Sequence, residues 1–173
     1  MTAATTVSAT NEQRARDIFR RLFDERDLTE PGWYWADGLV ARLHALDLTL
    51  RGPDGMAEFF TSLFAAVPDF TMEVEDVLGH EQGATIRWRA RGTFDGAPWQ
   101  GIEPTGSHID LPGVDVMRFD AGGRVIDNAV YYDGAEFARE IGMLPKRDSA
   151  ADRAVLGAFN AATKAKRRFR RAG

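Results

Sequence analysis

Apolar positions in the first third of the chain follow helical spacing. In residues 10–26 they recur every three or four positions, and Thr10 with Gln13 forms a candidate capping box at the start of a helix. Residues 33–46 are apolar enough for a second, short helix followed by an extended segment. Pro53 is suited to the first position of a third helix. The pattern therefore predicts three N-terminal helices.

From residue 71 onward the period changes from helical to two, which is typical of β-strands. A short helix follows the strands, with Asp133 as its N-cap and Gly142 just past its end, and a further helix follows a polar linker. Helices followed by an antiparallel sheet predict an α+β fold. The predicted strands cover residues 71–78, 84–94, 98–102, 108–119 and 124–132.

Strand alternation indicates which side chains face the core. Arg87, Arg89 and Arg91 share one face of a predicted strand, and burying three unpaired arginines would be very costly. That face must be outside or paired, so Ile86, Trp88 and Ala90 are expected inside. The same reasoning places Asp115, Asn128 and Tyr132 inside, and it places Asp127 outside, where it could pair with the arginine face.

Composition narrows the classes of function. The 173 residues suit one domain, and the absence of cysteine excludes disulfides, thiolate nucleophiles and cysteine-based zinc sites. The net charge is −4, and six basic residues in 164–171 leave −10 for residues 1–163. An acidic body argues against a nucleic-acid-binding groove on the main domain. The basic tail alone could touch RNA, anionic lipid or the acidic body, although a solvated tail is the simpler interpretation.

The sequence also predicts location and organisation. Residues 1–10 lack a basic, apolar leader, and no apolar stretch is long enough to span a membrane, so we expect a cytoplasmic protein. We expect a disordered N-terminus at 1–10, one domain at 11–145, and a helical extension with the basic tail at 146–173. No glycine-rich phosphate loop and no histidine pair with metal-ligand spacing occurs. The prediction is therefore no cofactor and no metal.

Several motifs carry a resemblance to a known family. In chain order they are GPDGMAEFF, VPDFTMEVEDVL, IRWRARGTF, GIEPTG, GVDVMRFDAGGRV and YYDGAEFAREIGMLP. Over about residues 11–145 the chain resembles the SnoaL-like polyketide cyclases of the nuclear-transport-factor-2-like (NTF2-like) superfamily. The resemblance implies an NTF2-like cone, in which a curved antiparallel sheet wraps around N-terminal helices and encloses an apolar pocket, here with an additional C-terminal helix. It also implies a homodimer formed through the outer sheet face.

The resemblance also assigns catalytic positions. The cyclase acid/base position falls on Val130, three residues before the helix-capping Asp133. The Asp–Arg–Asp set of limonene-type epoxide hydrolases falls on Trp88, Ala90 and Val130, which are all apolar, so that mechanism is not expected. The segment VDVMRFD resembles the ketosteroid isomerase segment that carries an oxyanion-stabilising aspartic acid, and Asp115 matches it.

The other ketosteroid isomerase positions are not matched. The partner tyrosine falls on Phe19, and the base falls near Leu43, beside His44. We therefore predict Asp115 as an inward acid or hydrogen-bond donor with a raised pKa, and His44 as a possible base. The alternatives are a buried Asp115 satisfied by a backbone group or water, and a purely structural His44.

The predicted pocket suits a flat, apolar, oxygenated ligand. His108 is included as a rim residue, although alternation turns it outward unless Pro112 and Gly113 bulge the strand. The predicted function is cofactor-free acid/base cyclisation, isomerisation or dehydration α to a carbonyl of a polycyclic or polyketide-like substrate. The alternative is a non-catalytic ligand-binding or dimeric scaffold protein. The predicted substrate-binding residues are Phe19, Phe60, Trp88, Trp99, Asn128, Tyr132 and His108.

Overall fold

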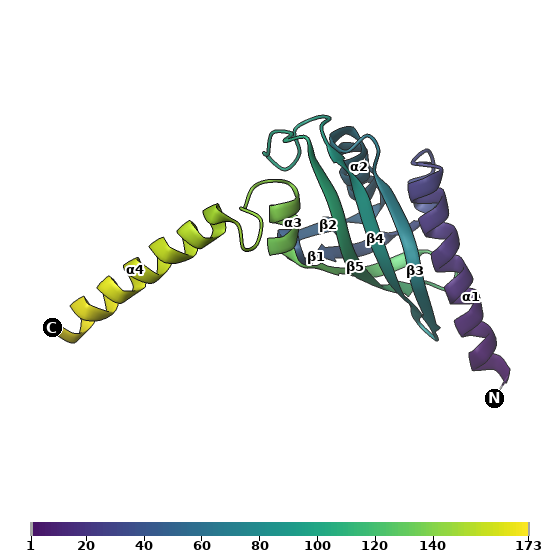
Figure 1. Ribbon diagram of the computed structural model, residues 1–173. Coiled ribbons are helices and arrows are strands. Elements are labelled where there is room, and N and C mark those ends of the chain that lie inside the picture. The colour runs from purple at the N-terminus through teal and green to yellow at the C-terminus, as the bar shows by residue number, and fades with distance from the viewer. Residues whose placement is uncertain (1, 173) are drawn as a thin grey trace.

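A computed structural model describes residues 2–172, with side chains described for residue 7 and residues 9–167. It shows an α+β fold in which a curved sheet of six strands, in the order β2-β1-β6-β5-β4-β3, is covered by helices (Figure 1). Neighbouring strands are antiparallel, except that β1 runs parallel to β6. The strands are β1 Trp35–Leu43, β2 Leu48–Arg51, β3 Thr71–His80, β4 Gly83–Phe94, β5 Ser107–Phe119 and β6 Val125–Tyr132.

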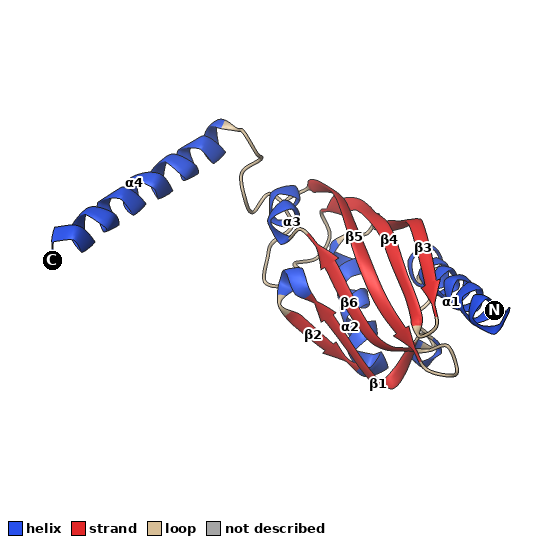
Figure 2. Cartoon of the chain, turned by 90° about the horizontal axis from the view of Figure 1, so that it is seen from below, coloured by secondary structure: helices blue, strands red, loops and turns tan. Residues whose placement is uncertain are grey.

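The helices differ in how they meet this sheet. Helix α2 lies across one face of the sheet and α1 runs along β3, whereas α4 projects away from the body (Figure 2). The apolar side chains Val155, Leu156 and Phe159 of α4 are exposed. Within residues 2–172 no helix combines the length and apolarity needed to cross a membrane. The helices are α1 Thr2–Phe19, α2 Gly52–Ala66, α3 Gly134–Glu140 and α4 Ala150–Ala172, with short turns at Arg20–Asp24, Pro31–Trp33 and His44–Leu46.

The N-terminal part differs from the sequence prediction. Helix α1 begins at Thr2, so residues 2–10 are helical where disorder was expected, and Thr10 lies inside the helix rather than at its N-cap. The segment 33–46 contains strand β1 instead of a second helix. Short apolar runs do not separate helix from strand, and pairing with both β2 and β6 decides the outcome here.

The predictions further along the chain are closer to the structure. Pro53 was expected at the first position of its helix, but α2 begins at Gly52, so Pro53 takes the second position, still within the first turn. The carboxylate of Asp133 caps α3 by accepting hydrogen bonds from the backbone N–H groups of Ala135 and Glu136 at 2.9 and 3.0 Å, and Gly142 follows with a φ of 81°. Residues 98–102 are not a strand: they make only one isolated bridge, between Trp99 and Ile102.

The arginine face of β4 is outside and paired, as predicted. Arg87 forms an ion pair with Glu75 at 3.1 Å, and Arg89 forms one with Asp110. Asp127 also faces outward, but it pairs with Arg42 on β1 at 2.8 Å instead of with the arginine face. The reason is the strand order, which places β6 beside β1 and separates it from β4 by β5.

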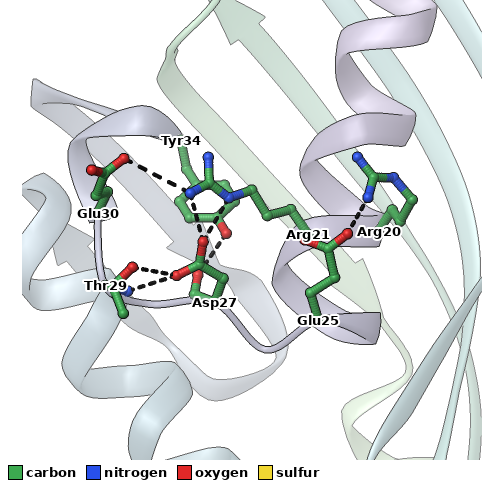
Figure 3. A network of polar contacts seen from close by, with 7 residues as sticks. All are labelled: Arg20, Arg21, Glu25, Asp27, Thr29, Glu30 and Tyr34. Carbon is green, nitrogen blue, oxygen red and sulfur yellow. Dashed lines mark hydrogen bonds and ion pairs between the residues drawn. The ribbon is translucent and has the colours of Figure 1, made fainter.

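A network of hydrogen bonds and ion pairs connects residues of the segment between α1 and β1 (Figure 3). The Arg21 guanidinium donates to the Asp27 carboxylate at 2.7 Å, and Thr29 donates to the same carboxylate from its backbone N–H and its hydroxyl. The bonds from Thr29, followed by the one from Arg21, lower the pKa of Asp27 to about 2. The Tyr34 hydroxyl donates to the Asp27 carbonyl at 2.5 Å. The network therefore holds Tyr34, which is fully buried, in the core.

Candidate functional site

A cavity of about 110 Å³ lies between the inner sheet face and α2. Its wall is almost entirely aromatic and aliphatic, and it includes the predicted side chains Phe60, Trp88 and Trp99. The polar side chains that line it are Asp115, Asn128 and Tyr132, all from β5 and β6. The structure thus brings six of the nine predicted site residues to one cavity.

Asp115 is the buried acid of this cavity, and only 8% of its surface is exposed. It lies on β5, opposite Ile86 of β4 and Val130 of β6. Burial raises the pKa of Asp115 from its usual 3.8 to about 6, although the hydrogen bonds from Asn128 and Trp88 act in the opposite direction. A carboxyl with this pKa changes its protonation state near neutral pH.

Both oxygens of Asp115 accept a hydrogen bond from a side chain. The Trp88 indole Nε1–H donates to Oδ1 at 2.8 Å, and the Asn128 Nδ2–H donates to Oδ2 at 2.9 Å. Because both partners are donors, the arrangement favours the ionised carboxylate. The partners are side chains, in contrast to the backbone group or water of the alternative interpretation.

Trp88 reaches Asp115 because the residue beside it has no side chain. In the sheet register Gly113 lies between Trp88 on β4 and Tyr132 on β6. A Cβ added at Gly113 would overlap the six-membered ring of the Trp88 indole. The glycine therefore leaves the space that the indole ring occupies beside β5 while its N–H points at the carboxylate.

Tyr132 supplies a second polar group. Burial raises the pKa of its hydroxyl to about 12, so the hydroxyl stays protonated at neutral pH. Its ring packs against Trp88 and Phe137, with centroid distances of 6.3 and 5.8 Å. Tyr132 can therefore donate a hydrogen bond to a ligand in the cavity.

His44 and His108 do not line the cavity. His44 is exposed at the end of β1 and stacks on Tyr131, with ring centroids 4.5 Å apart. His108 lies on the outer sheet face, where its Nδ1 is 3.1 Å from the Thr93 hydroxyl. No register shift interrupts the β4–β5 pairing, so the bulge that could have turned His108 inward does not form.

Phe19 is buried in the core but does not line the cavity either; Phe23 lines it instead. The two rings are in contact, with centroids 5.2 Å apart. Residues four apart share one helical face, so the sequence pattern could not show which of them reaches the cavity. Among the described side chains, no group of three or more His, Asp or Glu residues is placed to hold a metal ion.

Comparisons with solved structures show the same fold. A candidate SnoaL-like polyketide cyclase from Jannaschia sp. CCS1 is 23% identical, with 78% of this chain and 96% of that chain covered and a TM-score of 0.65. AclR from Streptomyces galilaeus, a candidate hydroxylase, is 20% identical over 94% of this chain and 98% of that chain, with a TM-score of 0.68. IdmH from Streptomyces antibioticus, a candidate polyketide cyclase, is 21% identical over 75% of this chain and 99% of that chain, with a TM-score of 0.60.

A sequence search of curated proteins found no significant match. The family model described as SnoaL-like polyketide cyclase matches residues 13–141, which is about the range over which the motifs resemble that family. This match spans most of the chain and includes α2, the long strands of the sheet and every polar residue of the cavity. The chain therefore belongs to the SnoaL-like polyketide cyclase family.

Proposed function

We propose that the cavity binds an apolar, oxygenated small molecule and catalyses cofactor-free acid–base chemistry α to its carbonyl group. The outcome would be a cyclisation, an isomerisation or a dehydration. The observation that carries this proposal is Asp115, a buried carboxyl whose pKa is raised to about 6 and which opens onto an apolar cavity. A carboxyl with a pKa near neutral pH can both take and return a proton.

The hydrogen bonds support an order of events. Asp115 starts as a carboxylate, because Trp88 and Asn128 both donate to it. It takes a proton from the carbon next to the carbonyl, while the Tyr132 hydroxyl donates to the carbonyl oxygen, on which negative charge develops. Asp115 then returns the proton to another carbon, or to the oxygen formed when the enolate carbon attacks a second carbonyl. Asp115 thus acts first as a base, and the acid role predicted for it from the sequence corresponds to the second step, in which it returns the proton.

The size of the cavity limits the ligand. An engineered cavity of about 150 Å³ in another protein holds one benzene molecule, and the cavity here measures about 110 Å³. We infer that at most one ring, or a chain segment of similar size, reaches Asp115. A polycyclic substrate would place its other rings outside this space.

The alternative is a protein that binds such a ligand without converting it. It is favoured by the lack of a second base: among the described residues that line the cavity, the titratable side chains are Asp115 and Tyr132. Val130, on which the family's acid/base position falls, lies directly opposite Asp115 and is apolar.

Deuterium exchange separates the two candidate functions. We expect the protein to bind cyclohexanone weakly and to accelerate exchange of its α-hydrogens in D₂O, measured by proton NMR at pH 7.5. The matched control is Asp110→Asn, which removes a carboxylate from the outer face of the same strand and should leave the exchange rate unchanged. Binding without accelerated exchange would favour the non-catalytic candidate, and absence of binding would contradict both.

We also propose that two copies pair through the outer sheet face. Leu78, Val116 and Tyr131 expose apolar surface on this face, and the ion pairs of the arginine face lie on the same face. Light scattering of the full chain should give about twice the monomer mass of 19.2 kDa. A mass of one chain at micromolar concentration would contradict this pairing.

A further inference from the structure

Asn128 holds a buried acceptor that the protein leaves unpaired. The side chain is 4% exposed and lines the cavity. Its Nδ2 donates to Asp115, while its Oδ1 has no hydrogen-bond partner among the described residues. The amide cannot be turned around while Asp115 is ionised, because Oδ1 would then face a carboxylate oxygen. An unpaired buried acceptor costs about 1–3 kcal/mol, so a ligand that pairs it gains affinity.

The neighbouring groups leave Oδ1 to the ligand. The Trp88 N–H is already bonded to Asp115. Asp115, Asn128 and Trp88 form a polar cluster. Around it, Ile86 of β4 and Val130 of β6 are apolar, and so are the side chains by which α2 lines the cavity. Tyr132 is the other titratable group among the described residues of the wall. Next to ionised Asp115 the cavity therefore offers an unpaired acceptor, Asn128 Oδ1, and Tyr132 offers a donor.

We propose that the ligand is a hydroxylated carbonyl compound whose hydroxyl donates to Asn128 Oδ1, and that this hydrogen bond reverses direction when Asp115 is protonated. A proton on Asp115 allows the Asn128 amide to turn, so that Oδ1 accepts from the carboxylic acid and the NH₂ group faces the cavity. The cavity then favours ligands that accept hydrogen bonds. Asn128 is thus a specificity-determining residue for the proposed function. This inference rests on one part of that function, namely that the cavity binds a ligand.

Phenol and toluene test this inference, because they differ by a hydroxyl in place of a methyl group. The quantity measured is the ratio of the toluene Kd to the phenol Kd, by NMR titration of the full chain. We expect Asn128→Leu to lower this ratio by about threefold to tenfold at pH 8, the worth of one hydrogen bond. Ile109→Val, in the cavity wall but not in the polar cluster, should leave the ratio unchanged.

The wild-type chain provides a second measurement that does not depend on how the variant folds. Its preference for phenol at pH 8 should fall at pH 5, where Asp115 is protonated and the Asn128 NH₂ group faces the cavity, because phenol is a weaker hydrogen-bond acceptor than donor and stays neutral at both pH values. If both compounds bind with a ratio that changes neither with pH nor in Asn128→Leu, the inference is overturned while ligand binding stands. If neither compound binds, the proposed function fails, and the inference fails with it.

Discussion

Asp115→Asn is expected to gain stability as the pH rises, relative to the wild-type chain, while it loses α-proton exchange. In the folded state the pKa of Asp115 is about 6, compared with the usual 3.8. The folded chain therefore holds this proton over a pH range in which the unfolded chain has lost it. The wild-type chain loses stability as the pH rises from about 4 to above 6, and asparagine, which has no charge, removes that loss.

The expected size follows from the pKa. A tenfold change in proton affinity is worth about 1.4 kcal/mol, so the stability of Asp115→Asn relative to wild type should increase by about 2–3 kcal/mol between pH 4 and pH 8. Urea unfolding at both pH values measures this difference. The Asn128 amide can turn to accept from the new amide, so the substitution keeps the cluster paired.

Asp110→Asn provides the control on the same strand. Asp110 is exposed, and its pKa is lowered by its hydrogen bond with Arg89, so its removal should give a small pH dependence of the opposite sign. If Asp115→Asn and wild type differ by the same amount at pH 4 and pH 8, the raised pKa of Asp115 is contradicted. The acid–base role of Asp115 would then lose its basis.

The inner faces of β4 and β5 could be predicted because charged residues mark the outer face. Three arginines at alternate positions had to lie outside, and this placed Trp88 inside. Alternation along β5 placed Asp115 inside and His108 outside in the same way. These inferences need only the two-residue period of a strand, so they do not depend on which strands are neighbours.

The features that were wrong or were not predicted depend on information that the pattern does not contain. His44 was expected in the cavity from a segment predicted as a helix followed by an extended stretch. In the structure that segment is strand β1, which ends at Leu43, and His44 begins the turn that follows. The partner of Asp127 depends on strand order. The bonds from Trp88 and Asn128 to Asp115 depend on the register across three strands, which includes a shift between Arg118 and Phe119 in the β5–β6 pair. Contacts between distant segments determine these features.

Gly113 shows how such a contact can position a functional group. The backbone of β5 does not require glycine at this position, because Gly113 does not have a positive φ. The reason lies on the neighbouring strand, where the Trp88 ring occupies the space that a Cβ would need. The sequence around Gly113 therefore indicates a strand, and only the register reveals that the residue positions the donor to Asp115.

Gly113→Ala is therefore expected to displace the Trp88 indole and break its hydrogen bond to Asp115. Overpacking and a buried group left without its partner should together destabilise the chain by about 3 kcal/mol. The pKa of Asp115 should rise further, because one of the two bonds that oppose its increase is lost. Urea unfolding measures the first effect, and titration of the Asp115 carboxyl by NMR measures the second.

Two further variants show whether the overlap with Trp88 is the cause. Gly38→Ala adds the same methyl group to β1, where no atom lies within 4 Å of the added Cβ, so it should change neither stability nor the titration of Asp115 appreciably. In the background of Trp88→Phe the shorter ring leaves room for the methyl group, and Gly113→Ala should cost much less there. An equal cost in both backgrounds would show that Gly113 serves the strand itself and has no part in positioning the indole.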